Sequence, residues 1–504
     1  MNRITVITIL GAFLLSCAPA AAQVHYNSDG NPWKQSANRG PDAEVKGWFY
    51  NLGITGIRAQ LVPEAPKHLL VKHVFKGSPA HPAVKPGDFI VGVNGKRFKT
   101  EHKNGYGMDK FGPDGPILEF AQALERIQGK QANGILKLDL LRRKKKVKAV
   151  LKIGTTYGAF TKTFPSQCPK TKRILGELYA YLAQEQRDDG SWGSPPHDLF
   201  APLALLASGK RKYLPMVTKN VRMHARTTTA KDSSWLINWR YMAAGIVMSE
   251  YYLATRKIWV RKELEEVYSF LTSSQYTDMS QIDEKTKVDR PQDLPKTKIR
   301  AMGGWGHNPG FEGYGPISML TGQGALTFAL MNHCGIDVDR KRHDGAYDFL
   351  ARGTGPNGYL WYADEVAGKK DWADMGRTGA AGIANFLSPY GNKKYRVRAM
   401  DHARVIGEHP ESFPDTHGSP VMGMGFAALA ANVHPASFRK LMDANRWWFV
   451  LSQCCDGSFY YQPNRDNAGY GWDSRISASA VTALILSIDR KNLHITGKPF
   501  KKRR

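Results

Sequence analysis

A pattern of aromatic residues, glutamine and glycine that recurs through the second half of the chain constrains the fold more than any other feature. In its first copy the apolar pair Tyr181-Leu182 is followed by Gln186 and then by Gly190-Ser191-Trp192. The same order returns as Phe270-Leu271, Gln275 and Gly303-Gly304-Trp305; as Phe349-Leu350 and Gly358-Tyr359-Leu360-Trp361, without the glutamine; and as Trp448-Phe449, Gln453 and Gly457-Ser458-Phe459. A fixed order of residues that returns along a chain is typical of a fold built from repeated units.

Each copy has a physical interpretation as the end of a helix. The large apolar pair anchors the last turn, the glutamine bonds to backbone groups that the helix end leaves unpaired, and glycine allows a tight exit. An apolar stretch rich in small residues follows each copy, at 202–207, 322–331, 379–386 and 478–488. Because helices with small side chains pack closely, these stretches predict a bundle of paired helices.

This pattern resembles the QW-type repeats of the α/α-toroid superfamily, which includes squalene-cyclase-like and protein-prenyltransferase-like proteins. The resemblance extends over about residues 171–490 and implies an all-α ring of inner and outer helices around a central cavity. The chain contains neither the Asp-x-Asp-Asp motif of the terpene cyclases nor the Asp-x-Cys zinc pair of the prenyltransferases. Terpenoid cyclase or prenyltransferase-like activity is therefore the least favoured function.

The first part of the chain predicts a separate small α+β domain. Pro86-Gly87-Asp88 is typical of a turn, and 89–93 is typical of a buried strand. A helix over 117–127 and two strands within 135–153 are expected to follow. This order resembles a bacterial PDZ domain over about residues 48–155.

The resemblance to PDZ domains implies a groove in which a peptide adds as an extra strand. The carboxylate-binding loop of that family corresponds to Leu52-Gly53-Ile54, whose backbone N–H groups would receive a peptide C-terminus. A polar insertion over 103–110 departs from a compact PDZ domain. The sequence therefore leaves two roles open for this domain, peptide binding and an intramolecular spacer.

The chain begins with features of an exported protein. A basic residue, an apolar run and small residues occupy 1–22, which is the pattern of a cleaved signal peptide. The segment before Cys17 also resembles a bacterial lipobox, which would tether the protein to a membrane through that residue. We therefore predict a periplasmic or extracellular protein, either soluble or lipid-anchored. A flexible lead, a linker and a basic tail are predicted at 23–47, 156–170 and 491–504.

An excess of basic residues narrows the range of partners. Lysine and arginine number 71 against 44 aspartate and glutamate, which gives a net charge of +27. This charge favours polyanions, and export favours an acidic polysaccharide or an envelope surface over nucleic acid. A diffusely basic surface without such a partner is the alternative. Because the cysteines show no CxxC and no zinc-site spacing, we expect no metal and no cofactor.

Two loop segments, within 374–419 and 459–475, gather polar and aromatic residues inside otherwise apolar helical sequence. Tyrosine rings stack on sugars, while Asp, Asn and Arg bond to hydroxyls and carboxylates. The candidate catalytic residues are Asp415, His417, Arg465, Asp466, Tyr470 and Asp473, and the candidate cavity residues are Asp374, Arg377, His409, Tyr461, Asn464 and Arg475. His307-Asn308-Pro309 fits either a cavity lining or a turn.

These residues permit two reactions and one structural role. A pair of aspartates, Asp415 with Asp466 or Asp473, would serve glycoside hydrolysis. His417 or a tyrosine would instead abstract a proton beside a uronate carboxylate that is paired with arginine, a β-elimination that the basic charge favours. Alternatively, the same loops cap helices and close the ring, with Asp415 as an N-cap.

The sequence thus predicts a multidomain protein in which a small α+β PDZ-like domain is followed by an all-α toroid. Its first predicted function is binding or scaffolding, with the PDZ-like domain capturing a peptide and the toroid an anionic glycan or envelope component. The alternative is a polysaccharide-acting enzyme, a lyase more than a hydrolase, with its site in the toroid cavity.

Overall fold

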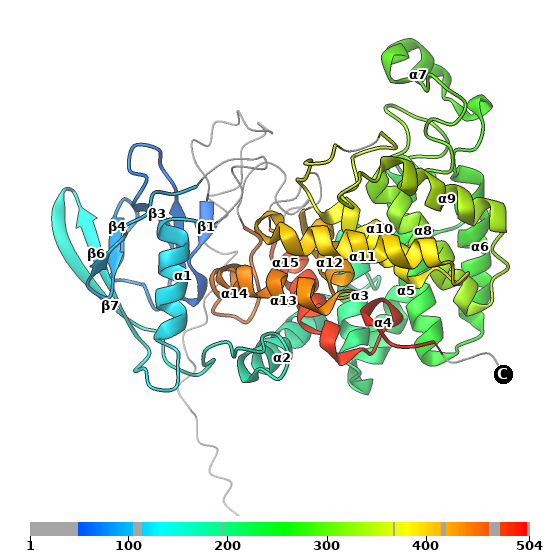
Figure 1. The fold of residues 1–504 in the computed structure, drawn as a ribbon. Helices are drawn as coiled ribbons and strands as arrows, with labels where there is room; N and C mark the ends of the chain where they lie inside the picture. Colours follow the sequence, from blue (N-terminus) through cyan, green and yellow to red (C-terminus); the bar gives the residue numbers. More distant parts are fainter. Residues whose placement is uncertain are drawn as a thin grey trace, which may run out of the picture.

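The computed structural model describes residues 49–103, 113–193, 195–365, 368–414, 420–462 and 474–500. Within these residues the chain forms a small sheet domain and a large ring of helices (Figure 1). The predicted signal peptide, Cys17 and the flexible lead lie outside the described residues. No helix in the described part is long and apolar enough to cross a bilayer.

The sheet domain contains an antiparallel sheet with the strand order β1-β2-β3-β4-β6-β7, in which β5 pairs with β4. One α-helix, α1, accompanies it. The bounds are β1 Phe49–Asn51, β2 Ile57–Gln60, β3 Leu69–Val74, β4 Phe89–Val93, β5 Lys96–Arg97, α1 Pro116–Arg126, β6 Ile135–Arg142 and β7 Lys145–Lys152. The predicted strand over 89–93 is β4, and the predicted helix and the last two strands are α1, β6 and β7. The small α+β domain is therefore present where the sequence indicated it.

Six pairs of helices in the described residues form the second domain. The outer helices are α2 Pro169–Gln184, α4 Leu214–Thr227, α6 Trp259–Ser274, α9 Arg340–Gly353, α11 Lys393–Glu408, and α13 Pro435–Ala444 together with α14 Arg446–Ser452. The inner helices are α3 Pro195–Ala207, α5 Ile237–Thr255, α8 Ser318–Cys334, α10 Gly376–Leu387, α12 Pro420–Ala431 and α15 Ser474–Leu486. Each inner helix packs against the next, and α15 packs against α3. The ring is therefore closed, which confirms the predicted toroid.

Small residues on the inner helices allow their close approach. A Cβ added at Gly379 of α10 would lie 2.4 Å from the backbone N of Ala427 on α12. The rings of Phe200 and Phe426 meet edge to face inside the ring, with centroids 6.0 Å apart. These two side chains therefore fill part of the interior of the ring, where the resemblance implied a cavity.

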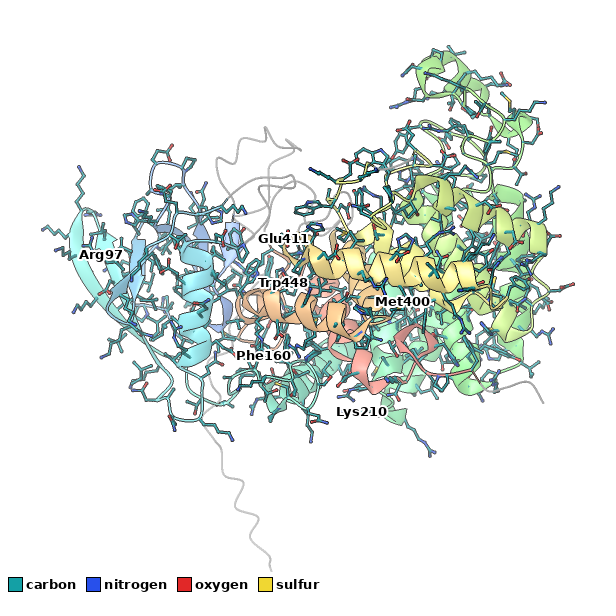
Figure 2. All side chains as sticks on the ribbon, in the orientation of Figure 1. Arg97, Phe160, Lys210, Met400, Glu411 and Trp448 are labelled. Atoms are coloured by element: carbon teal, nitrogen blue, oxygen red, sulfur yellow. The ribbon has the colours of Figure 1, made fainter. Side chains whose placement is uncertain are left out.

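The two ends of the ring differ in the length of their connections. Each outer helix leads into its inner partner through a long segment: 185–194, 228–236, 275–317, 354–375, 409–419 or 453–473. The connections at the opposite end are short, as at 256–258 and 432–434. Glu411 and Lys210, one from each kind of connection, lie at opposite ends of the ring in Figure 2. We call the end at which the inner helices begin the N-terminal face.

Two of the three glutamines of the repeat have the role that the sequence predicted for them, whereas Gln453 Nε2 has no hydrogen-bond partner among the described residues. Gln186 Nε2 donates to Gly190 O at 3.0 Å and to Met216 O of α4 at 2.9 Å. Gln275 Nε2 likewise donates to Gly303 O at 2.8 Å and to Arg342 O of α9 at 3.0 Å. Gln186 and Gln275 thus each join their own turn to the next outer helix.

The longest connection, 275–317, carries the short helix α7, Glu284–Asp289, and extends beyond the ring at the N-terminal face (Figure 1). It has a small core of its own, which includes Tyr276, Ile282 and Phe311. Asp364 receives Arg300 Nε at 2.9 Å and Arg352 Nε at 3.1 Å. These ion pairs attach the base of the segment to the ring.

Candidate functional site

A row of hydrogen-bonded aromatic and polar side chains crosses the N-terminal face. Trp239, near the start of α5, donates through Nε1 to His307 Nδ1 at 2.8 Å. His307 Nε2 is hydrogen-bonded to the hydroxyl of Tyr314, and Tyr362 donates its hydroxyl to the same oxygen at 3.3 Å. The guanidinium of Arg377, at the start of α10, lies 5.4 Å from the Tyr362 ring centroid. Residues far apart in the chain thus meet in one row.

The hydrogen bonds of the row determine the protonation of His307. An indole N–H can only donate, so His307 Nδ1 must be the acceptor and Nε2 must carry the proton. Burial lowers the pKa of His307 below its usual value, which also favours the neutral ring. His307 therefore donates to the Tyr314 oxygen. Since Tyr362 donates to that oxygen as well, neither neighbour takes the hydrogen of the Tyr314 hydroxyl.

Tyr314 and Tyr362 line a cavity of about 380 Å³ between the 275–317 segment and the ring. Tyr314 is 40% exposed, so part of this residue is accessible to a ligand. Lys296, Arg300 and Glu365 also line this cavity. Arg300 is paired with acidic residues, whereas Lys296 has no ion pair among the described residues. The cavity lining therefore combines two tyrosines with one cation, Lys296, that has no carboxylate partner in the described part of the chain.

Two of the predicted cavity residues, Asp374 and Arg377, lie at this face and are buried. Arg377 donates to the hydroxyl of Tyr359 at 2.8 Å and lies 3.5 Å from Asp374. Asp374 also accepts the backbone N–H of Gly376 at 2.9 Å, at the start of α10. Burial raises the pKa of Tyr359, so its hydroxyl stays protonated. Asp374 and Arg377 therefore form the buried end of the row.

The other described candidates bind neighbouring loops together. Arg475 donates to Asp456 at 2.7 Å and to Ser458 at 3.1 Å, inside the last repeat turn. Tyr461 donates its hydroxyl to the carbonyl of Pro414, and His409 stacks on Trp372 with centroids 4.1 Å apart. These contacts match the capping role that the sequence left open. Asp415, His417, Asn464, Arg465, Asp466, Tyr470 and Asp473 lie outside the described residues.

Sequence reasoning missed Trp239, Tyr314 and Tyr362. Each stands in a connection or at a helix start, where a single aromatic residue has no periodic signal. His307, which was singled out as either a turn or a cavity residue, and Arg377, a predicted cavity residue, both lie in the row.

The predicted peptide-binding loop contacts the ring. A Cβ added at Gly53 would lie 2.7 Å from Val450 O of α14, and Cys455 Sγ donates to Ile54 O at 3.0 Å. Asn51 Nδ2 donates to Leu451 O at 2.5 Å and to Gln453 O at 3.2 Å. We call these contacts the interdomain joint.

The edge of β2 opposite β3 pairs with β1, so a peptide strand would have to displace β1. Peptide binding stays a prediction.

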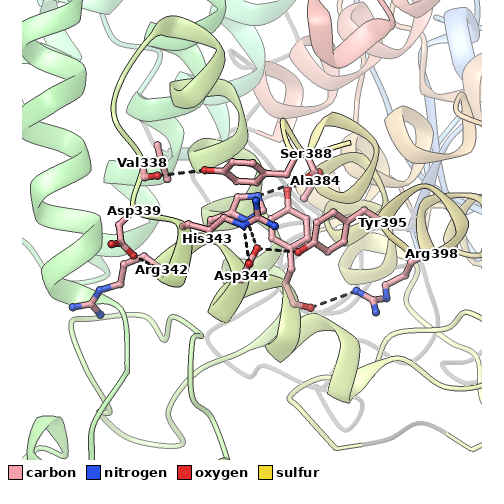
Figure 3. A network of polar contacts seen from close by, with 12 residues as sticks. Val338, Asp339, Arg342, His343, Asp344, Ala384, Ser388, Tyr395 and Arg398 are labelled. Atoms are coloured by element: carbon pink, nitrogen blue, oxygen red, sulfur yellow. Dashed lines mark hydrogen bonds and ion pairs between the residues drawn. The ribbon is translucent and has the colours of Figure 1, made fainter. Parts of the chain in front are cut away.

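Other polar groups lie away from the N-terminal face. At the opposite end, Phe500 stacks between His333 and His494, with centroids 3.5 Å and 4.2 Å away, beside a cavity of about 760 Å³. Figure 3 shows a second network, in which His343 bonds to Asp344 at 2.9 Å and Tyr395 donates to the same carboxylate at 3.0 Å. His343 is fully buried, and this network joins α9 to α11.

Residues 171–497 match the family model described as a domain of unknown function, DUF6288. The chain belongs to the DUF6288 family. The matched region is the ring together with the segment that follows α15, whereas the sheet domain lies outside it. No curated protein matches the chain.

Several solved structures are similar to the DUF6288 ring. The α-1,6-mannanase GH76A from Salegentibacter sp. HEL1_6 has a TM-score of 0.45 at 11% identity, over 63% of this chain and 98% of its own. The type II terpene cyclase MstE from Scytonema has a TM-score of 0.41 at 10% identity, over 64% and 98%. Cellobiose 2-epimerase from Bacillus thermoamylovorans B4167 has a TM-score of 0.39 at 11% identity, over 62% and 98%. Likenesses this low carry no inference about activity.

Proposed function

We propose that the N-terminal face is the active site of an enzyme that acts on a polysaccharide, with Tyr314 as its proton-transfer group. One observation carries this proposal, namely the hydrogen bonding of the Tyr314 oxygen. It accepts from His307 and Tyr362, and Tyr314 lines the cavity. Two donors stabilise negative charge on that oxygen, as a residue that gives and takes a proton requires.

The lining of the cavity suits a sugar that carries a carboxylate. The rings of Tyr314 and Tyr362 offer stacking surfaces for a pyranose. Lys296, which has no ion pair among the described residues, offers a charge for a uronate carboxylate. The predicted preference for a lyase over a hydrolase is therefore kept in this proposal.

The reaction is a β-elimination in which Tyr314 first removes a proton and then returns it. Its phenolate takes the proton from C5 of the uronate, the electron pair forms the C4–C5 double bond, and the C4–O bond breaks. The leaving oxygen then takes the proton back from the phenol. Neutralisation of the carboxylate by Lys296 makes the C5 proton easier to remove.

The test is an assay of the purified protein on polygalacturonate, alginate and hyaluronan, followed by the ultraviolet absorbance of the new double bond. We expect turnover with one of them and a loss of at least about a hundredfold in Tyr314→Phe. Tyr390→Phe is the matched control, since that phenol bonds to Val338 O away from the cavity. A Tyr314→Phe variant as active as the wild type would refute the proposal.

Binding without turnover is the second candidate, as the sequence first indicated. Arg377 and Arg475 form ion pairs within the protein and are not presented at the cavity. Because neither arginine can then assist the elimination, this pairing favours binding without turnover. A thermal shift with an acidic polysaccharide, without any product, would support binding. Absence of both product and shift would contradict both candidates.

A further inference from the structure

Tryptophans that the fold leaves partly exposed gather at the N-terminal face. Among the described residues, the tryptophans that are not buried are Trp235, Trp239, Trp259, Trp361 and Trp372. All but Trp259 lie on the long connections or, for Trp239, in the first turn of an inner helix, whereas Trp259 begins α6 at the opposite end. Several exposed aromatic residues at one face indicate a binding surface more than single ones do.

Trp235, directly before α5, is 79% exposed. The backbone after it is fixed, because Asn238 Nδ2 donates to Gly306 O at 2.9 Å and the Asn238 N–H donates to His307 O at 3.2 Å. Between Trp235 and these bonds, Leu236 adopts a left-handed conformation with φ +61°, which is unfavourable for a residue with a Cβ. The chain therefore holds an indole in water beside the segment that carries His307.

Trp361 is 38% exposed and directly precedes Tyr362, which lines the cavity. Its backbone N–H donates to the carbonyl of the last residue of α9 at 3.0 Å. Its ring centroid lies 6.2 Å from that of Tyr359, whose hydroxyl accepts from Arg377. Trp361 is therefore fixed beside the buried end of the row, whereas Trp235 is fixed beside the other end.

Several rings of the row separate these two tryptophans. Successive ring centroids are 5.9 Å apart for Trp239 and His307, 5.5 Å for His307 and Tyr314, and 6.0 Å for Tyr314 and Tyr362. An aromatic ring offers a stacking surface of about the size of one pyranose. A ligand that contacts both ends of the row and the Tyr314 between them therefore has several sugar units.

The polar groups beside these rings favour a saccharide chain as the occupant. Lys296, Arg300 and Glu365 line the cavity next to the row. The core of an interface with another protein is depleted of charged residues, because covering them costs free energy. A saccharide instead offers hydroxyls and carboxylates to the polar groups and ring faces to the indoles.

We propose that Trp235 and Trp361 bind sugar units outside the cavity, so that the N-terminal face holds an extended polysaccharide chain. The proposal rests on the proposed function for the identity of the ligand. Because the two indoles stand at the two ends of the row and Tyr314 lies between them, the reacting unit has neighbours on both sides. Cleavage is therefore expected within the chain rather than at its end.

The test measures binding by isothermal titration calorimetry, with fragments of three and of about twelve units from polygalacturonate, alginate and hyaluronan. We expect the wild type to bind one of the long fragments at least about tenfold more tightly than the short one. Trp235→Ala and Trp361→Ala should each lose about tenfold in affinity for that long fragment. Trp235→Phe keeps a stacking ring and should restore most of the loss. Phe386→Ala is the matched control, since Phe386 is 44% exposed near the end of α10, at the opposite end of the ring.

Two binding results would overturn the proposal. One is an affinity of Trp235→Ala for the long fragment within about twofold of the wild type, and the other is a wild type that binds no long fragment more tightly than the short one. Because Trp235 is largely exposed, its replacement leaves the fold intact, so this variant decides the matter even if Trp361→Ala unfolds. A dimer that dissociates in Trp235→Ala, with saccharide binding unchanged, would assign the rings to a contact between copies and also overturn the proposal.

Failure of the proposed function gives a different result. Binding of long fragments that depends on Trp235, without any unsaturated product, would remove the lyase and support the extended binding surface. Turnover that requires Tyr314 but is the same on long chains in Trp235→Ala and in the wild type would support the lyase and overturn the extended surface.

Discussion

Replacement of Asn51 by alanine tests how the sheet domain is attached to the ring. Asn51 is 2% exposed, and its side-chain amide donates to two buried carbonyls, Leu451 O and Gln453 O. Each buried carbonyl that loses its donor costs about 1–3 kcal/mol. The backbone N–H of Asn51, which donates to Gln462 Oε1 at 3.0 Å, is unaffected by the change. Two carbonyls would cost about 2–6 kcal/mol, but the change also removes the buried Asn51 Oδ1, which has no partner among the described residues, so we expect the joint to lose about 2–4 kcal/mol.

The thiol of Cys455 offers a direct assay of this loss. Its sulfur donates to Ile54 O within the joint and is half-buried, whereas Cys454 next to it is fully buried. If the joint opens locally, labelling of Cys455 under native conditions reports the opening equilibrium. A loss of about 2–4 kcal/mol raises that equilibrium by roughly 30-fold to 1,000-fold, since 1.4 kcal/mol is a factor of ten.

The control for this experiment is Asn133→Ala in the same domain. Asn133 is exposed and accepts a single hydrogen bond from Ile135 N, so its loss should leave Cys455 labelling unchanged. A labelling rate in Asn51→Ala within about threefold of the wild type would refute the reasoning. In that case the apolar contacts around α14, and not the Asn51 amide, hold the domains together.

Two further predictions concern stability. Gly53→Ala places a Cβ at φ +67° and 2.7 Å from Val450 O, so we expect the free energy of unfolding to fall by about 2–4 kcal/mol in urea titration. Gly87→Ala, at φ +88° with open space around it, measures the backbone strain alone, and an equal loss in both would contradict the predicted clash. The raised pKa of Asp198, about 7, means that the folded state keeps a proton that the unfolded chain releases near about pH 4. Its contribution is complete below that pH and declines towards pH 7, by up to about 4 kcal/mol. The stability difference between the wild type and Asp198→Asn should therefore change over this range, and a constant difference would exclude the shift.

The repeated architecture of the ring was predictable from the sequence, because its signals are local. Gln186 and Gln275, and the glycines that follow them, act on the helix end that they follow. The small residues of α8, α10 and α15 show in the sequence because they recur within a single helix. Inner helices α5 and α12 were not predicted, since no copy of the pattern precedes either of them.

The candidate site depended on tertiary structure. Trp239 and His307 are 68 residues apart, and Tyr314 and Tyr362 are 48 apart. Both pairs meet because long connections between outer and inner helices all emerge at one end of the ring. The charge state of Asp198 is likewise invisible in sequence, because burial and not residue type raises its pKa.

The attachment of the two domains shows most clearly what the sequence by itself could not determine. The composition and turns of 48–155 indicated a small domain, and the Leu52-Gly53-Ile54 loop indicated a ligand site on it. In the folded chain, that loop packs against α14, and Asn51 bonds to Gln462, which is 411 residues away. Local patterns determine which helices, strands and turns form, because their hydrogen bonds close over a few residues. Which surfaces then meet is decided only when the ring closes and brings its last repeat beside the first strands.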